Sequence, residues 1–155
     1  MRKLHKVLTV GWICVFLLIL GGISAFASPD TLPGDVVTTK EGLVYVKAPE
    51  LESSSTTNAK LAISATASEG TVVTVYKYNF DTGLYEKLWM NDAPVEATVG
   101  PSLLYVAQVD LTPGLNKFLV RGAWDEDTYA VARFEVNLLN EDFMDRIKGI
   151  INVFF

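Results

Sequence analysis

Apolar and polar residues alternate along most of the chain between residues 43 and 138, which is the period of half-buried β-strands. The pattern predicts strands at residues 43–47, 60–67, 71–78, 84–89, 103–111, 116–124 and 128–138, with a further short strand at 95–99. Turn-forming residues separate these runs, and helical periodicity is absent before residue 140. About seven short alternating strands predict an all-β fold, a Greek-key β-sandwich.

The stretch TPGLN, residues 112–116, separates two of the clearest strands. Pro113 can fix φ at the first corner of a turn, and Gly114 can supply positive φ at the second. The side-chain amide of Asn116 can hydrogen-bond backbone groups that the turn leaves without partners. We therefore expect Pro113, Gly114 and Asn116 to form a structural corner at which the chain leaves one sheet and enters the facing one.

Alternation also assigns a face to each side chain on the two strands that flank this corner. The positions expected to face the core are Tyr105, Ala107, Val109, Leu111, Phe118, Val120 and Gly122. The positions expected to face water are Gln108, Asp110, Lys117 and Arg121.

The first 27 residues have the organisation of an export signal. Three cations precede an uncharged apolar run, and small residues at Ala25 and Ala27 fit the site that signal peptidase cleaves. We expect residues 1–27 to be a signal peptide and the protein to be secreted or displayed at the cell surface. The alternative is an uncleaved membrane anchor, because residues 7–27 carry no charge and are long enough to span a bilayer.

Three further segments follow the predicted signal. Residues 28–42 are polar and contain Pro and Gly, so we expect a flexible lead-in. Residues 43–138 form the predicted sandwich, in which the Ser- and Thr-rich residues 48–58 are expected to be a loop. Residues 140–155 form a tail with a different periodicity.

The tail predicts a C-terminal amphipathic helix, which Asn140 can cap. Its apolar face, a candidate interaction site, consists of Phe143, Ile147, Ile150, Ile151 and Phe154. A lone helix of this length is marginal in water, so we expect this face to be buried against the sandwich, a partner protein or a second copy. Membrane-surface binding is less favoured, because the polar face offers few cations.

The composition restricts the chemistry that the chain can perform. The single histidine and the single cysteine both lie within residues 1–27, so residues 28–155 have no catalytic triad, thiol nucleophile, disulfide or zinc site of the usual ligands. Residues 1–27 contain three of the 13 Lys and Arg residues and none of the 18 Asp and Glu residues, which leaves a net charge of −8 beyond them. This charge argues against nucleic acid. We expect no catalysis and no cofactor; a small carboxylate-based hydrolase is the remaining enzymatic alternative.

Two groups of side chains are candidates for ligand binding. Trp89 and Trp124 can form an aromatic platform for a glycan, although a tryptophan at a strand end is more often part of the core or its rim. Asp125 and Asp127 can ligate calcium through oxygen. Adjacent acids cannot all point at one ion from a tight turn, so we expect a solvated loop and no metal.

The order of EGTVVTVYKY (69–78), YVAQVDLTPGLNKFLVRGAW (105–124) and YAVARFEV (129–136) resembles the bacterial immunoglobulin-like (Big-type) domains of exported proteins. Those domains share general features with fibronectin type III modules. The resemblance covers residues 61–138; residues 90–101 and the tail depart from the pattern. It implies an immunoglobulin-like sandwich that serves as a spacer, an adhesin or an accessory domain.

From these observations we expect a non-catalytic exported module that mediates protein interaction at the bacterial cell envelope or outside the cell, with an unknown protein or envelope partner. The alternative is a carbohydrate-binding module that uses exposed aromatic side chains. A membrane contact is expected only if residues 1–27 are not cleaved from the chain.

The predicted cleavage site gives a first test. N-terminal sequencing of exported protein should find Ser28 as the first residue, because Ala25 and Ala27 occupy the positions that signal peptidase recognises. A chain that keeps Met1 and stays in the membrane fraction would establish the anchor instead.

Overall fold

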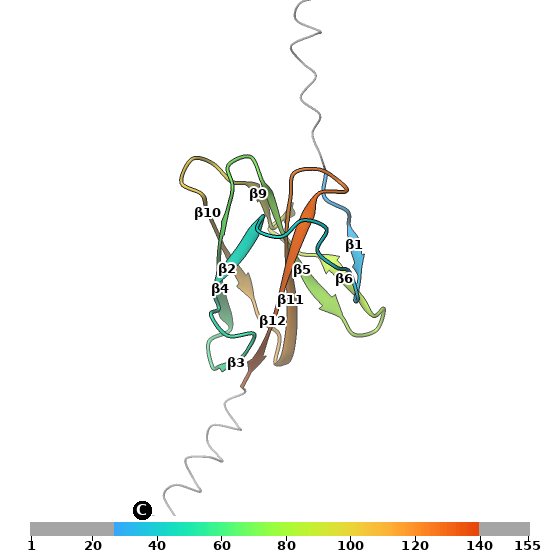
Figure 1. The fold of residues 1–155 in the computed structure, drawn as a ribbon. Coiled ribbons are helices and arrows are strands. Elements are labelled where there is room, and N and C mark those ends of the chain that lie inside the picture. Colours follow the sequence, from blue (N-terminus) through green and yellow to red (C-terminus); the bar gives the residue numbers. More distant parts are fainter. Residues whose placement is uncertain (1–26, 140–155) are drawn as a thin grey trace, which may run out of the picture.

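The computed structural model describes residues 27–139, and this range is all-β, which confirms the predicted class. The strands are β1 (Thr31–Pro33), β2 (Val44–Ala48), β3 (Ser53–Thr56), β4 (Lys60–Ala67), β5 (Val72–Asn79), β6 (Leu84–Lys87), β7 (Trp89–Met90), β8 (Ala93–Pro94), β9 (Glu96–Thr98), β10 (Leu104–Asp110), β11 (Gly114–Ala123) and β12 (Tyr129–Leu138). Most of them belong to two sheets that pack face to face (Figure 1).

Each sheet joins strands that are distant in sequence. The larger sheet has the order β1-β6-β5-β11-β12-β3, and β9 also pairs with β5. The small sheet has the order β10-β4-β2, while β7 and β8 form a separate hairpin. Pairing is antiparallel except between β3 and β12, which are parallel. The chain therefore crosses between the two sheets several times.

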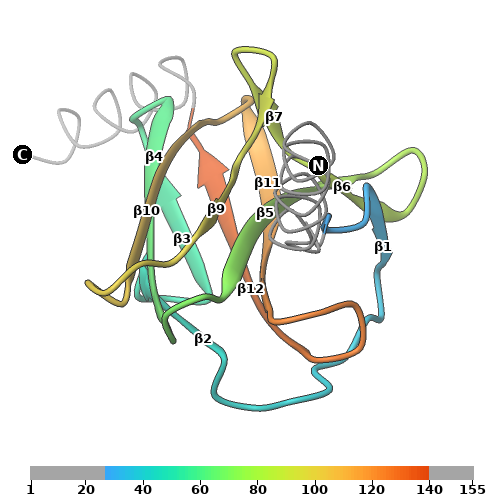
Figure 2. The same cartoon turned by 90° about the horizontal axis from the view of Figure 1, so that it is seen from above.

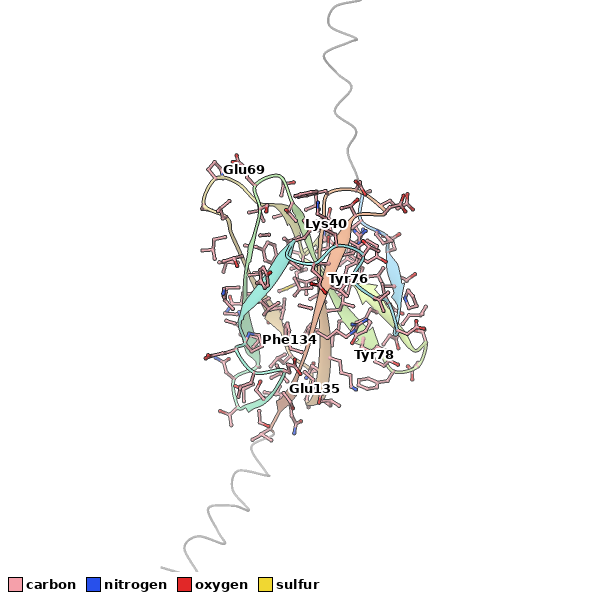
Figure 3. The ribbon with its side chains drawn as sticks, viewed as in Figure 1. Lys40, Glu69, Tyr76, Tyr78, Phe134 and Glu135 are labelled. Atoms are coloured by element: carbon pink, nitrogen blue, oxygen red, sulfur yellow. The ribbon has the colours of Figure 1, made fainter. Side chains whose placement is uncertain are left out.

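The main core lies between the sheets. The rings of Phe118 on β11 and Phe134 on β12 stack with their centroids 5.4 Å apart, and Figure 3 shows Phe134 on the side of β12 that faces the small sheet. The predicted core positions beside the corner are all buried except Ala107, which is half-buried. A Cβ atom added at Gly122 would lie 2.7 Å from Cβ of Val44, so this glycine allows β2 to approach β11 closely.

The TPGLN stretch joins β10 of the small sheet to β11 of the larger sheet, as its turn chemistry predicts. Gly114 has a φ of +88°. The buried side chain of Asn116 accepts the backbone N–H of Thr112 at 2.9 Å and donates to the carbonyl oxygens of Thr112 and Gly114 at 2.7 and 2.9 Å. A further bond of 3.4 Å to the carbonyl oxygen of Val136 joins the corner to β12. One side chain therefore replaces the backbone pairing that the chain loses where it changes sheets.

The Ser- and Thr-rich segment that was expected to be a loop contains β3, so that expectation was wrong. β3 pairs with residues Glu135 to Leu138 at the edge of β12. Backbone hydrogen bonds from Glu135 N to Glu52 O (2.7 Å) and from Leu139 N to Thr56 O (2.8 Å) extend this pairing. An edge strand held by its backbone needs no apolar alternation, which explains why the pattern did not reveal it.

Residues 28–42, expected to be a flexible lead-in, are instead packed on the larger sheet, as Figure 2 shows for β1 beside β6. Leu32 and Val36 are buried against the outer face of this sheet. Thr39 donates its backbone N–H to the carbonyl oxygen of Tyr129 at 2.9 Å. Two buried apolar side chains and backbone hydrogen bonds contribute to holding these residues on the sheet, so their polar composition was misleading.

This covered outer face contains a second cluster of buried side chains. The cluster consists of Leu32, Val36, Tyr76, Tyr85 and Leu119. Arg121, which was expected to face water, lies in the same layer and is only 1 % exposed. Its guanidinium carbon is 4.4 Å from the centroid of the Tyr129 ring, and Nη2 donates to the carbonyl oxygen of Glu126 at 3.0 Å. Alternation had placed Arg121 on the correct face, but residues 28–42 exclude water from this part of it.

The positive φ at Gly114 predicts the effect of replacing it. Gly114→Val should lower the free energy of unfolding by about 1–3 kcal/mol, because a β-branched residue resists this conformation. A Cβ atom at this position would meet nothing within 4 Å, so the loss would come from the backbone alone. Gly114→Asn is the matched control and should lose much less, since Asn tolerates positive φ. Equal denaturation midpoints for Gly114→Val and the unchanged protein would contradict the corner.

Candidate functional site

The outer face of the small sheet carries an exposed apolar patch. We call it the β10 face, and it consists of Tyr45, Leu104 and Val106, whose exposed fractions are 59 %, 49 % and 64 %. The strand register places Leu104 and Tyr45 on either side of Thr66, so the patch crosses all three strands. Exposed apolar side chains that gather on one face are typical of an interaction surface, whereas scattered ones are ordinary.

The free edge of β10 borders this patch. Ala67 N donates to Leu103 O at 3.1 Å and Leu111 N donates to Ala59 O at 2.8 Å, so the odd-numbered residues direct their backbone groups toward β4. In an antiparallel pair the alternate residues direct theirs away. The N–H and C=O groups of Leu104, Val106, Gln108 and Asp110 therefore point outward, and within residues 27–139 no strand pairs with them.

The edges formed by the other strands are less suited to pairing with a further chain. β1 has three residues and ends in Pro33, and β3 has four residues, all Ser or Thr. The register of β2 shifts between Val46 and Ala48. Short length, proline and irregular register are devices that prevent edge-to-edge association. β10 has seven residues and contains neither proline nor lysine, so its edge has none of these protections.

Sequence reasoning did not identify the β10 face, although the sequence contained its signal. The run LLYVAQVDL assigns Tyr105, Val109 and Leu111 to the core, and the same alternation assigns Leu104 and Val106 to solvent. Two apolar side chains at solvent positions of one strand are the deviation that could have found it. The expected solvent positions Gln108 and Asp110 are exposed, and Lys117 is half-exposed beside Glu135 at 3.5 Å.

The structure does not bring the two candidate tryptophans together. In Figure 2 the β7–β8 hairpin, which contains Trp89, projects at the top, and the loop after β11, which begins with Trp124, projects at the lower right. Both rings are about half exposed, but Nζ of Lys40 lies 3.8 Å from the centroid of the Trp124 ring. The indole Nε1 of Trp124 donates to Oγ1 of Thr71 at 3.1 Å. Trp124 therefore ties the N-terminal segment and the start of β5 to the end of β11.

The acidic turn uses Asp125 to hold itself together. Its Oδ1 accepts the backbone N–H groups of Asp127 at 3.0 Å and Thr128 at 2.7 Å. Hydrogen bonding from Thr128 holds the pKa of Asp125 below its ordinary value. Residues 27–139 contain no group of three or more His, Cys, Asp or Glu side chains that could hold a metal ion. The arrangement is that of a hydrogen-bonded turn.

A hollow of about 500 Å³ opens between β2 and β12. Its lining includes Val46, Phe134, Arg133 and the acidic side chains of Glu50 and Glu52. Both of these glutamates are exposed. A general acid at neutral pH needs a pKa raised by burial, and an exposed carboxyl lacks that environment. The hollow therefore does not favour the carboxylate-based hydrolase.

The beginning of the described chain is anchored to the larger sheet by polar contacts. The hydroxyl of Tyr76 donates to the carbonyl oxygen of Pro29 at 2.8 Å. Lys87 donates its backbone N–H to Asp30 O at 2.8 Å, and its Nζ lies 3.1 Å from Oδ1 of Asp30. Burial raises the pKa of Tyr76 well above its ordinary value, and the nearby Arg121 opposes part of that rise.

The apolar face of the predicted C-terminal helix, Phe143 to Phe154, and residues 1–26 of the predicted signal lie outside the described residues. The part of the chain from 27 to 139 contains no helix that is long and apolar enough to cross a membrane. Comparison with protein-family models, curated proteins and solved structures finds no match to this chain.

Burial of Tyr76 predicts a loss of stability in alkali. Its pKa is higher in the folded chain than the value of about 10 expected when unfolded. Its contribution is therefore fully present below pH 10 and is lost as pH rises above it. Tyr76→Phe should make the decline in unfolding free energy above pH 10 shallower, at a cost near neutral pH of about 1 kcal/mol for the lost bond to Pro29. Urea unfolding at several pH values tests this, and identical slopes for the two proteins would contradict it.

Proposed function

We propose that the two sheets form an immunoglobulin-like Greek-key sandwich. The strand order supports this. In chain order β2, β4 and β10 would be strands A, B and E of such a domain, and β5, β6, β11 and β12 would be C, C′, F and G. The E–F corner, which a tyrosine holds in many of these domains, would here be held by Asn116. β1 and β3 are then additions at the two edges of the larger sheet.

On this fold we infer a non-catalytic exported module that mediates protein interaction at the bacterial cell envelope or outside the cell. The observation that carries this proposal is the β10 face beside an open strand edge. The signal-like first 27 residues support export, and the net charge of −8 that follows them disfavours nucleic acid as the partner.

The mode of binding that fits this surface is strand addition. An extended segment of a partner protein would pair with the outward N–H and C=O groups of Val106 and Gln108 and with the C=O of Leu104. The N–H of Leu104 already donates to Oγ of Ser102 at 3.4 Å. Alternate side chains of the added strand would lie over the outer face of the small sheet beside Leu104 and Val106 on β10. Backbone pairing would supply affinity, and the apolar patch would favour β-branched or aromatic residues in the partner.

Carbohydrate binding has weaker support. A sugar ring stacks on an open aromatic face, and Lys40 lies over the ring of Trp124. Trp89 is the more open of the two rings, but it belongs to a separate hairpin. A glycan-binding assay of Trp89→Ala would therefore test a single-residue platform only.

Site-specific photocrosslinking in the exporting cell tests the protein-interaction proposal. A benzoylphenylalanine in place of Val106 should form a covalent adduct with a discrete protein, because Val106 is the most exposed side chain of the β10 face and lies on its edge strand. The same group in place of the exposed Asp81, in the loop between β5 and β6, is the matched control and should give no such adduct. No adduct at position 106, or the same adducts at both positions, would contradict the proposal.

A further inference from the structure

Ser28 is buried although it directly follows the predicted cleavage site. Only 3 % of its surface is exposed, whereas Ala27 is exposed. Its carbonyl oxygen accepts a hydrogen bond from Nζ of Lys87, and its Oγ lies 2.7 Å from Oγ1 of Thr74. The residue at which the processed chain would begin is therefore packed into the folded domain by specific contacts.

The chain of hydroxyl groups that starts at Ser28 ends on a carboxylate. Oγ1 of Thr74 donates its proton to Oε2 of Glu96 at 2.7 Å, so the Ser28 hydroxyl must be the donor in its contact with Thr74. Glu96, on β9, is half-buried and belongs to neither ion pair found among the described residues, although its charge attracts Arg121. A half-buried carboxylate with one neutral donor is suited to receive a cation.

We propose that the α-ammonium group formed at Ser28 when residues 1–27 are removed binds the carboxylate of Glu96. Hydrolysis of the Ala27–Ser28 amide consumes one water and leaves a carboxylate on Ala27 and an ammonium on Ser28. That ammonium is on the same residue whose hydroxyl already reaches Glu96 through Thr74. The inference rests on the proposed export and cleavage. Cleavage would then have two results: it releases the protein, and it creates an ion pair that stabilises the fold.

The neighbouring charges identify Glu96 as the partner. Lys87 on β6 donates to the carbonyl oxygen of Ser28, and Tyr76 on β5 lies beside the Ser28 side chain. The charged groups that act on Tyr76 are Arg121 on β11, Glu96 on β9 and Asp30 before β1. Asp30 is already paired with Lys87 at 3.1 Å. Lys87 and Arg121 repel an additional cation. Glu96 attracts Arg121 but is in neither ion pair of the described residues, so it is the carboxylate of this group that can take the ammonium as a direct partner.

Four full-length processed chains test the proposal without requiring export. They begin at Ser28 or at Ala27, each with Glu96 or with Glu96→Gln, and each is released from a cleavable N-terminal fusion. The chain that begins at Ser28 should melt about 3 °C or more above the chain that begins at Ala27 at pH 7. The extra residue moves the ammonium out of the site, and Glu96→Gln should abolish the difference. Glu69→Gln, which removes an exposed carboxylate in the loop between β4 and β5, is the matched control and should preserve it (Figure 3).

The pH dependence gives a second, independent readout. An ion pair raises the pKa of the ammonium above the usual value of about 8, so the advantage of the Ser28 chain should be full below that pH and lost as pH rises. NMR titration of the Ser28 ammonium should find its pKa raised with Glu96 and lowered by Glu96→Gln, even if melting is affected by other losses. Equal melting of the two chains, or an ammonium pKa unaffected by Glu96→Gln, would overturn the proposal. A failure of the proposed export or cleavage would be detected by a different measurement, N-terminal sequencing of the protein made in the cell.

Discussion

The contact between the N-terminal segment, residues 28–40, and the outer face of the larger sheet determines much of this structure. Leu32 and Val36 pack with Tyr76, Tyr85 and Leu119, so this part of the outer face is removed from water. Arg121 can be buried there because its guanidinium stacks on the Tyr129 ring and donates to backbone carbonyl oxygens. A buried guanidinium is tolerated only with such partners, so the segment and the end of β11 depend on each other.

The same contact determines which surface is free to bind. The larger sheet packs against the small sheet on one face and against the N-terminal segment on the other. The small sheet has no corresponding cover within residues 27–139, so its outer face exposes Tyr45, Leu104 and Val106. Burial of Ser28 belongs to this arrangement as well, because Thr74, Tyr76 and Lys87 fix the start of the segment. The proposed interaction surface and the proposed ammonium site therefore have one structural origin.

Local chemistry made part of the fold predictable from sequence. Most of the corner's hydrogen bonds lie within residues 112–116, so the roles of Gly114 and Asn116 could be assigned without knowledge of the rest. The strand positions and inward faces also followed, because period-two alternation reports directly which side chains share a face. The β10 edge could have been inferred in the same way, from apolar residues at solvent positions.

The errors concern what covers a face, which alternation does not report. Arg121 was placed on the outer face correctly, but the cover is formed by a segment about 90 residues earlier in the chain. β3 and β1 are held by backbone hydrogen bonds, which any sequence can make, so their polar composition predicted loop. The position of Glu96 beside Ser28 likewise depends on tertiary structure and had no signal in the sequence.

Hydrogen exchange of the chain that begins at Ser28 tests the central claim most directly. The amide N–H groups of Val36, Thr39 and Lys40 donate to backbone carbonyl oxygens. If the segment is a fixed cover of the larger sheet, these amides should exchange far more slowly than in an unstructured peptide, at rates close to those of β11. Exchange of residues 30–40 at the rate of an unstructured peptide, while β5 and β11 remain protected, would show that the outer face is not covered and would contradict the account.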